Sequence, residues 1–420
     1  MLKAEQNERL TRVGPGTPMG ALMRRYWQPI AAKQELVEKR TKAVRLMGED
    51  LVLYRDRQGG LGLITRYCPH RRVDMTHCGI PENSGLRCAY HGWMFDSTGQ
   101  CVEQPFEEVA NPDAHFKERT KIAGYPVQEL GGLIWAYLGP LPAPLLPRWH
   151  PLVMEHAVRD IAITQLPCNW LQCQENSLDP VHVEWMHRYF GYWVNEQKLG
   201  NFAVTEGVGN AQRHLKIGFD EFDYGIIKRR VLEGYTEEDD DWKHGHPVLF
   251  PNTLVVGNSF QVTMQFRVPV DDENTLHISL YTWGAAPGRG APVQAAPPYR
   301  NVKLFDDQGN WVTDKIFNQD YMAWITQGSI AQRHLERLGA SDAGIILFRQ
   351  QIEREIRKVE TGQDPMNTFR DAAANVRLDL PIEHIKFGAP TPPPQYFPGE
   401  EGYSRDAELI EAVLETWRVP

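Results

Sequence analysis

Hydrophobic and polar residues alternate in short stretches through the first third of the chain. Residues 43–47, 50–54 and 61–65 show this two-residue period and are separated by glycine-containing turns, so the pattern predicts a small antiparallel β domain. Residues 133–138 have the composition of one further, buried strand. The proline-rich residues 140–147 predict a semi-extended connector at the end of this domain.

The rest of the chain mixes longer strands with helices. Alternation over residues 212–219, 260–269 and 276–283 predicts strands of one antiparallel sheet. Apolar residues at helical spacing predict a helix over 341–360 and an amphipathic helix over about 405–417. The fold class is therefore α+β, with a small antiparallel β domain and a larger mixed domain.

The same patterns divide the chain into three parts. Residues 1–40 are expected to form a helical segment that packs on the larger domain. The small β domain spans 41–147, and the larger domain spans 148–420.

Four metal-binding side chains lie in the predicted turns of the small domain. Cys68 and His70, then Cys88 and His91, supply one thiolate and one imidazole from each of two loops. Such a set can close a tetrahedral zinc site or hold a [2Fe–2S] cluster of Rieske type. Zinc sites usually show Cys-x₂₋₄-Cys or His-x₃₋₅-His spacing. The mixed pairs, followed by Gly92-Trp93, therefore favour the cluster.

A second candidate site lies in residues 169–187. His182, His187 and an acidic residue upstream have the composition of a two-histidine, one-carboxylate iron site, which leaves one face of the metal open to O₂ and substrate. Same-face neighbours on an α-helix are three or four residues apart, so both rings converge only if the helix ends or bulges, and Pro180 favours an irregularity. The alternative is two unrelated helix histidines. A one-electron cluster needs an acceptor, however, and an O₂-activating iron needs a donor.

Composition narrows the choice of partners and compartment. The net charge of −9 argues against a nucleic-acid surface. No stretch has the length and hydropathy of a membrane span, and the N-terminus does not have the pattern of a signal peptide. Six cysteines, two of them in the metal loops, favour a reducing cytoplasm over a disulfide framework. The acidic run 237–241 is expected to be a solvated loop.

Several stretches resemble the oxygenase (alpha) subunits of Rieske non-haem iron aromatic-ring-hydroxylating oxygenases. They are residues 14–27 (GPGTPMG…RRYW), the two ligand loops, the run from Glu175 to His187, and residues 319–345. Together they resemble the branch that contains phthalate and phenoxybenzoate oxygenases and dehydrodivanillate O-demethylase. One departure is Arg71-Arg72, where many relatives have Arg-Gly. The fold implied is a Rieske domain followed by a helix-grip-like catalytic domain.

The resemblance also implies a role for each candidate residue. His182 and His187 would bind iron with a distant carboxylate, best matched by Asp320 just before a predicted helix. Nearby rivals for this third position are Asp306, Asp307 and Asp314.

Asp179, with Asn176 in the same run, is the catalytic candidate. The resemblance implies that Asp179 links His91 of one subunit, or less favourably His70, to His182 of the next. The alternative is a helix cap, since Asp before proline is a good helix start. Both roles are compatible only if they use different carboxylate oxygens. A head-to-tail contact of this kind implies a homotrimer or stacked trimers.

The implied activity is that of a terminal oxygenase component. The sequence has no convincing dinucleotide-binding fingerprint, so electrons would come from NAD(P)H through a separate reductase or ferredoxin. The reaction expected is O-demethylation of a methoxylated, lignin-derived aromatic acid, with formaldehyde released. The alternatives are ring (di)hydroxylation of a phthalate- or phenoxybenzoate-like acid and, from another class, a Rieske electron carrier or a zinc scaffold.

An aromatic carboxylate needs a cation in the pocket, and arginine serves best. Arg229 and Arg230 lie on a predicted strand, where alternation directs only one of them inward. A solvated basic edge is the alternative. Ser177 is a further candidate, as a hydroxyl beside the iron.

Overall fold

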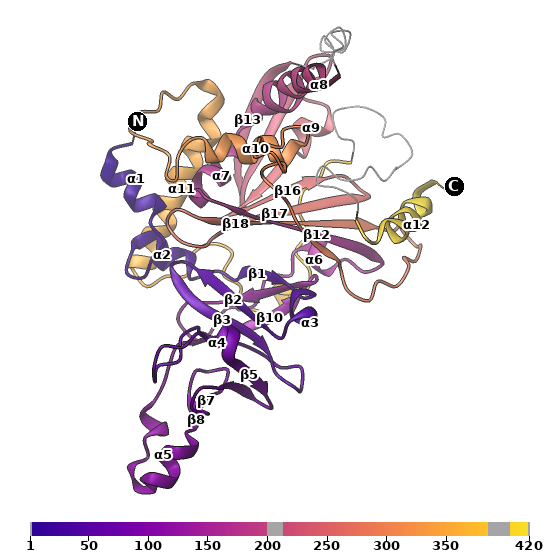
Figure 1. The fold of residues 1–420 in the computed structure, drawn as a ribbon. Helices are drawn as coiled ribbons and strands as arrows, with labels where there is room; N and C mark the ends of the chain where they lie inside the picture. The colour runs from indigo at the N-terminus through magenta and orange to yellow at the C-terminus, as the bar shows by residue number, and fades with distance from the viewer. Residues whose placement is uncertain (1, 200–212, 385–403, 419–420) are drawn as a thin grey trace.

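The structure is a computed structural model that describes residues 2–199, 213–384 and 404–418. It has a smaller region with two four-stranded sheets and a larger region built on an eight-stranded sheet (Figure 1). This arrangement confirms the α+β class. Among the described residues, no helix is both long enough and apolar enough to cross a membrane.

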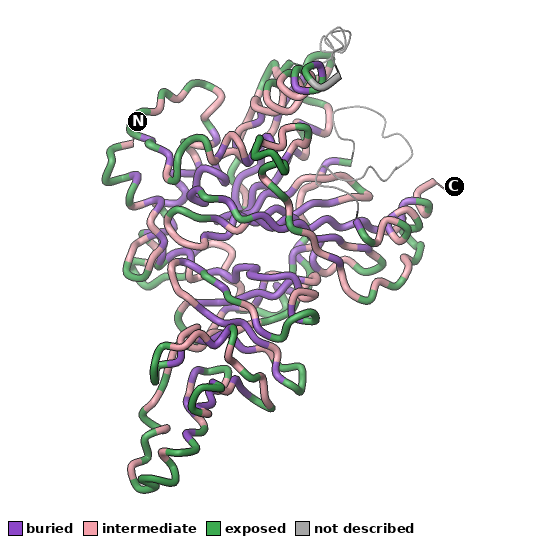
Figure 2. Tube along the Cα trace, in the orientation of Figure 1, coloured by how far each residue is buried: buried purple, intermediate pink, exposed green. Residues whose placement is uncertain are grey.

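The smaller region consists of short antiparallel strands joined by tight turns. The first sheet has the order β2-β3-β4-β9, and the second has the order β5-β6-β7-β8. Their bounds are β2 Thr41–Leu46, β3 Glu49–Arg55, β4 Leu61–Thr65, β9 Gly124–Tyr125, β5 Gly79–Glu82, β6 Gly85–Cys88, β7 Met94–Phe95 and β8 Cys101–Glu103. Helices α4 (Met75–Cys78) and α5 (Pro105–Ala110) complete the region, and α5 lies at its exposed tip (Figure 2).

The larger region is organised by one long sheet of order β13-β14-β15-β16-β17-β18-β12-β19. Neighbouring strands pair antiparallel, except that β19 pairs parallel with β12. The strands are β12 Ala157–Leu166, β13 His214–Phe222, β14 Gly225–Leu232, β15 His246–Leu249, β16 Thr253–Gly257, β17 Gln261–Pro269, β18 Thr275–Gly284 and β19 Tyr299–Asn301. The three strands predicted for this sheet are thus β13, β17 and β18.

Helices flank the sheets. They are α1 Ala4–Thr11, α2 Pro18–Met23, α3 Glu35–Glu38, α6 His150–Val153, α7 Trp170–Asn176, α8 Gly191–Leu199, α9 Asp240–Lys243, α10 Ile316–Ile325, α11 Ala343–Glu360 and α12 Ala407–Arg418, with the π-helix η3 at Val183–Phe190. Short 3₁₀ turns lie at Pro112–Ala114, Lys117–Arg119, Ala340–Asp342 and Ala373–Asn375. Helix α11 confirms the helix predicted over 341–360, and α12 the last one.

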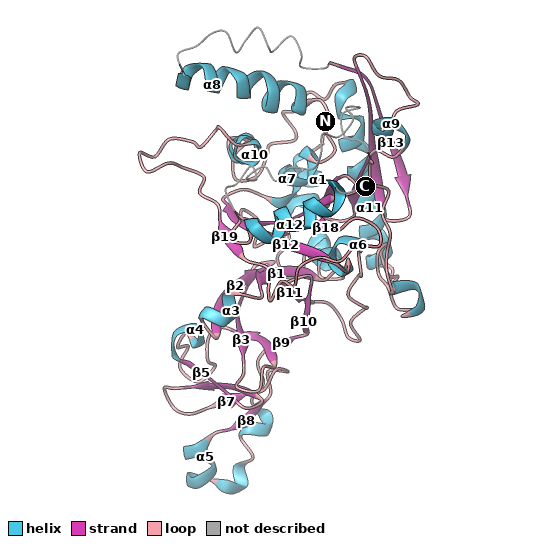
Figure 3. Cartoon of the chain, turned by 90° about the vertical axis from the view of Figure 1, so that its right-hand side faces the viewer, coloured by secondary structure: helices cyan, strands magenta, loops and turns pink. Residues whose placement is uncertain are grey.

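The eight-stranded sheet separates two environments. Helices α7, α10 and α11 cover one face, and a three-stranded sheet lies against the other (Figures 1 and 3). That small sheet comprises β1 (Gln28–Ala32), β11 (Leu133–Ala136) and β10 (Val127–Leu130). Trp135 packs edge-on against Phe266 with ring centroids 5.2 Å apart, which joins the two sheets. The N-terminal 40 residues are therefore not wholly helical, because β1 pairs with β11.

Candidate functional site

The two ligand loops of the smaller region bring their four side chains together. Cys68 and Cys88 are each only 1% exposed, and both pack in the core between the two sheets. The rings of His70 and His91 lie outside them, exposed to solvent, with centroids 4.3 Å apart. Trp93 stacks on His70 at 4.6 Å. Two buried sulfurs below two exposed imidazoles match the ligand arrangement that a Rieske cluster requires.

Both loops fold as the same tight turn. The backbone N–H of Arg72 donates to the carbonyl of Cys68, and the N–H of Gly92 donates to the carbonyl of Cys88. Both donors have left-handed backbone conformations, with φ of 60° at Arg72 and 77° at Gly92. Glycine adopts this region without strain, so the second loop has the favoured residue and the first does not. Arg72, which stands where many relatives have glycine, therefore occupies a backbone position that favours glycine.

The electrostatics of the loops fit a metal cluster. The pKa of the Cys68 thiol is raised to about 12, chiefly by burial; the backbone N–H of His70 opposes this shift, and the neighbouring Cys88 adds to it. Two adjacent buried thiolates are stable only when a cation neutralises them.

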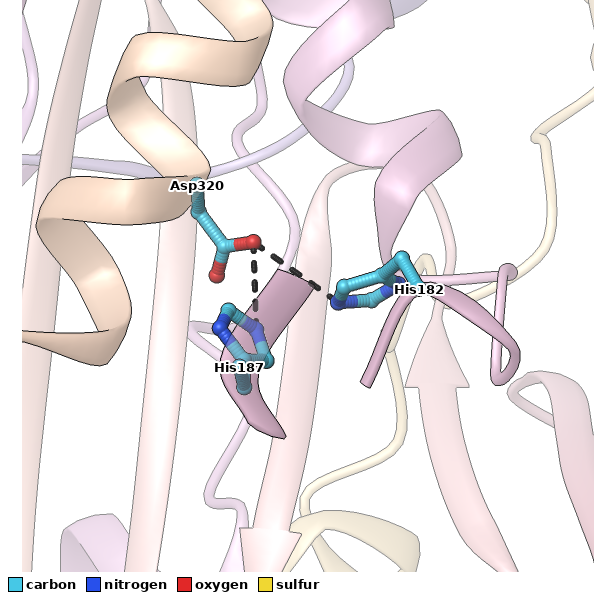
Figure 4. A group of neighbouring side chains, drawn as sticks. All are labelled: His182, His187 and Asp320. Atoms are coloured by element: carbon cyan, nitrogen blue, oxygen red, sulfur yellow. Dashed lines mark ion pairs between the residues drawn. The ribbon is translucent and has the colours of Figure 1, made fainter. Parts of the chain in front are cut away.

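The larger region holds the second set. The Nε2 atoms of His182 and His187 lie 3.6 and 3.3 Å from Oδ1 of Asp320 (Figure 4). His182 immediately precedes η3, and His187 lies within it. A π-helix has a wider turn than an α-helix, with hydrogen bonds from i to i+5. It therefore brings together two rings that a five-residue spacing would separate on an α-helix.

The geometry fits a small, octahedral metal. Bonds of about 2.1 Å place neighbouring ligand atoms of such a site about 3 Å apart. Asp320 Oδ1 is buried and accepts no hydrogen bond from any residue that the structure describes. Burial alone would raise the pKa of Asp320, but His187, His182 and the more distant Arg267 hold it below its ordinary value. An ionised, buried carboxylate oxygen without a donor is suited to bind a cation.

Asp320 lies within helix α10 rather than just before it. The sequence expectation was wrong by about one turn, because no strong cap precedes this helix: Lys315 is its N-cap and makes no side-chain cap bond. The rivals Asp306, Asp307 and Asp314 are exposed in the preceding segment.

Neighbouring groups orient the two imidazoles. His187 Nδ1 lies 3.0 Å from Oε1 of Gln319, whose amide nitrogen donates to the carbonyl of Thr313. The amide oxygen therefore accepts from Nδ1–H and leaves Nε2 free for a metal.

Asp179 uses its two oxygens differently. Oδ1 accepts from the backbone N–H groups of Val181 at 2.8 Å and His182 at 3.3 Å. Oδ2 lies 3.7 Å from Nδ1 of His182, longer than a hydrogen bond. Burial would raise the pKa of Asp179, but His182 and the two N–H groups lower it. The cap thus uses Oδ1 and leaves Oδ2 directed toward His182.

Buried ion pairs hold helix α7 in place. Glu175 is 6% exposed and accepts from the guanidinium groups of Arg333 and Arg349. At the other end, Asn169 Oδ1 caps the helix by accepting from the N–H of Leu171. Asn176 ends the helix, and Ser177 follows with a buried Oγ that makes no hydrogen bond within the described part of the chain.

The two candidate arginines point to opposite faces of β14. Arg229 bonds Asp220 at 2.5 Å and backbone carbonyls of α9 on the outer face. Arg230 is 4% exposed and bonds Asp241 at 2.6 Å. Asp241 itself is buried, so the acidic run 237–241 is not simply a solvated loop.

Sequence reasoning missed two further cations, Lys228 and Arg267. Lys228 lies two residues before Arg230 and is equally buried. Arg267 is 1% exposed, and among residues 2–199, 213–384 and 404–418 it donates only to Gln265 and leaves Nε without a partner. The two-residue spacing from Arg230 could have revealed Lys228. Nothing local reveals Arg267.

The chain is similar to known proteins over nearly its whole length. Residues 26–118 match a family described as "Rieske [2Fe-2S] domain", and residues 301–379 match "LigXa C-terminal domain like". The 5,5'-dehydrodivanillate O-demethylase oxygenase subunit of Sphingobium sp. (strain NBRC 103272 / SYK-6) is 48% identical, covering 91% of this chain and 87% of that protein. The phthalate 4,5-dioxygenase oxygenase subunit of Pseudomonas putida is 32% identical, covering 89% and 90%.

Solved structures show the same fold at low identity. NdmA of Pseudomonas putida CBB5 has a TM-score of 0.57 at 19% identity, covering 81% of this chain and 93% of that one. The terminal oxygenase of carbazole 1,9a-dioxygenase from Novosphingobium sp. KA1 has a TM-score of 0.55 at 18% identity, covering 85% and 99%.

A small β domain with a cysteine–histidine set and a large antiparallel sheet with a histidine–carboxylate set define a two-centre iron oxygenase. The chain belongs to the Rieske non-haem iron oxygenases, as an oxygenase subunit of the branch that contains the phthalate, phenoxybenzoate and dehydrodivanillate enzymes. It is an oxidoreductase that uses a Rieske [2Fe–2S] cluster, mononuclear iron and O₂.

Proposed function

We propose that this chain is the terminal oxygenase that demethylates a methoxylated, lignin-derived aromatic acid. The 48% identity to a dehydrodivanillate O-demethylase subunit, over 91% of the chain, carries this proposal. In the overall reaction an aryl methyl ether, O₂, two electrons and two protons give a phenol, formaldehyde and water. The iron centres supply the redox chemistry when bound.

Each candidate ligand has a role in this proposal. Cys68, Cys88, His70 and His91 hold the cluster, which the paired turns and buried sulfurs support. His182, His187 and Asp320 hold the mononuclear iron. The short Nε2–Oδ1 separations and the unpaired Asp320 oxygen support that assignment.

Electron transfer between the two centres is assigned to a subunit contact. Within one chain the cluster region and helices α7 and α10 lie on opposite sides of the eight-stranded sheet (Figure 1). His91 is exposed, and Asp179 keeps Oδ2 free of backbone donors. A neighbour's His91 could therefore reach Asp179, which in turn orients His182. Contacts of this head-to-tail kind close as a homotrimer, or as stacked trimers.

The substrate is assigned to the sheet face below the iron ligands. Arg267 is the cation for an aromatic carboxylate, since its guanidinium is buried and its hydrogen-bond partner among the described residues, Gln265, is neutral. Arg230 lines the same side with its charge balanced by Asp241, whereas Arg229 faces outward. Ser177 and Asn176, at the end of α7, complete the wall near the iron.

The same proposal covers the remaining parts of the system. Electrons come from NAD(P)H through a separate reductase or ferredoxin, and the system works in the cytoplasm. Residues 41–147 form the cluster domain and 148–420 the iron domain, and residues 1–40 pack on the iron domain through β1 and helices α1 and α2.

Ring hydroxylation is the second candidate. It is favoured by the 32% identity to a phthalate dioxygenase subunit over 89% of this chain. A carrier or zinc scaffold would not need the second metal-binding set or the large sheet around it.

The product decides between the candidates. Holoenzyme is mixed anaerobically with a surrogate reductase and an aromatic acid, and air is then admitted. Formaldehyde in proportion to O₂ consumed supports demethylation, whereas a diol without formaldehyde supports hydroxylation. No substrate-dependent O₂ uptake across methoxylated and unsubstituted acids contradicts both.

A further inference from the structure

Lys228 carries a buried ammonium group that has no counter-ion in direct contact. It is 6% exposed, and it makes no hydrogen bond or ion pair with any residue that the structure describes. Burying an unpaired cation is unfavourable by several kcal/mol. Its neighbour Arg230, by contrast, is paired with Asp241 at 2.6 Å.

Strand pairing places Lys228 on the same face of the sheet as Arg267. Ile226 pairs with Val248, Val248 pairs with Leu254, and Leu254 pairs with Gln265. Directly paired residues share a face, and so do residues two apart along a strand. Lys228 is two residues from Ile226, and Arg267 is two residues from Gln265. Both side chains therefore lie on the face that these paired residues share.

That face is the one toward the candidate iron site. The guanidinium of Arg267 lies over the ring of Trp324 in α10, 5.7 Å from its centroid. The pKa of Lys228 is lowered to about 8, chiefly by burial and also by the charges of Arg230 and Arg267, while the charges of Asp179 and Asp320 oppose this shift. Lys228 is thus close enough to sense both carboxylates, and it remains a cation at neutral pH.

Lys228 and Arg267 lie on the same face of the sheet but on strands that are not adjacent. β14 and β17 are separated by β15 and β16, so their backbones are three strand spacings, or about 14 Å, apart. One small carboxylate at Arg267 would leave Lys228 without an anion.

We propose that Lys228 is a specificity-determining residue that binds a second anionic group of the substrate, at the end remote from the carboxylate held by Arg267. This inference rests on the proposed function. The site would then select two-ring aromatic acids with an acidic group, a carboxylate or an ionised phenol, on each ring.

The test compares two-ring ligands on the holoenzyme. A methoxylated two-ring diacid is matched by the same framework with one carboxylate converted to an amide, and a third ligand carries a phenol in that position. Dissociation constants are measured by calorimetry under anaerobic conditions, and kcat/KM by O₂ uptake. Lys228→Met is expected to weaken diacid binding by about 10- to 100-fold, and monoacid-amide binding by less than about 3-fold.

Two matched variants complete the test. Lys228→Arg keeps the charge and should recover most of the diacid affinity. Arg229→Met, on the outer face of the same strand, should change neither ligand. Since Lys228 forms no hydrogen bond or ion pair with the described part of the chain, Lys228→Met should not lower Tm.

Equal loss for diacid and amide together with a lower Tm would make Lys228 a structural residue and overturn the inference. Unchanged diacid affinity would also overturn it. Weakened binding of only the phenol would assign the anionic group as a phenolate. If no aromatic acid binds to any variant or to the parent enzyme, the proposed function itself fails.

Discussion

The cluster loops and the iron site are built in opposite ways. The cluster set comes from two short turns of one small region, with sulfurs buried and imidazoles exposed. The iron set comes from a π-helical segment and from α10, where His187 and Gln319 are in contact although 132 residues apart. The first presents its imidazoles to solvent, which suits the exchange of electrons, and the second holds its ligand side chains partly or fully buried.

Removing an iron ligand should separate the two sites most sharply. His182→Ala is expected to lower product formation by more than about 1000-fold, because it removes one of the three proposed iron ligands. The cluster lies on the other side of the sheet and should keep its visible absorption. Cys88→Ser is the reciprocal variant, expected to lose the cluster while retaining mononuclear iron. Metal analysis and absorption spectra check both, and retained turnover in His182→Ala would refute the ligand assignment.

The burial of the iron-side face should make stability depend on pH. Lys228 has an ordinary pKa of 10.5 and a folded pKa of about 8, lowered by burial. Between these values the unfolded chain binds more protons, so the stability of the parent protein should rise with pH. Relative to Lys228→Met, the gain from pH 8 to 10.5 is on the order of 3 kcal/mol. The free energy of unfolding is measured by urea denaturation at several pH values. If it changes equally with pH in the parent protein and in Lys228→Met, the ammonium group of Lys228 is not buried as described.

Electron transfer from the cluster to the iron should depend on Oδ2 of Asp179. Asp179→Asn keeps the backbone cap, through its side-chain oxygen, but removes the negative charge near His182 Nδ1. Both metals should remain, while reoxidation of the reduced cluster in single turnover slows by roughly 10- to 100-fold. Asp306→Asn, on an exposed turn, is the control. An unchanged rate would remove the bridging role from Asp179.

The smallest expected effect is on stability, when Arg72 in the first loop is replaced by the glycine that the second loop has at the same position. Arg72 occupies the left-handed position that Gly92 fills in the second loop. Arg72→Gly should relieve that strain and stabilise the protein by at most about 1 kcal/mol, partly offset by loss of the Arg72–Tyr67 ring contact. Thermal unfolding of the holoenzyme measures it. A clear fall in Tm would show that the Arg72 side chain contributes more than its backbone costs.

The sequence predicts a site well when its residues lie in local turns, and less well when tertiary structure brings them together. The pairs Cys68/His70 and Cys88/His91 lie in local turns, so spacing alone could predict that their side chains form one metal-binding set. The convergence of His182 and His187 needed a helical irregularity, which Pro180 indicated, although a π-helix could not be specified.

Other features depended on tertiary structure. Asp320 came from resemblance to a family, because no local pattern connects α10 to η3. Arg267 and the pairing of Arg230 with Asp241 depend on sheet register and on a helix folding back against β14. The strand β1 was missed because it pairs with β11, about a hundred residues away along the chain.

The central claim is that electrons pass from the cluster of one subunit to the iron of the next. Chains with His182→Ala keep the cluster, chains with Cys88→Ser keep the iron, and each should be inactive alone. After unfolding, mixing at equal amounts and reconstitution, a head-to-tail assembly should regain about one quarter of the parent activity, because that share of contacts joins an intact cluster to an intact iron. Mixed assemblies that contain both metals but stay inactive would contradict the account.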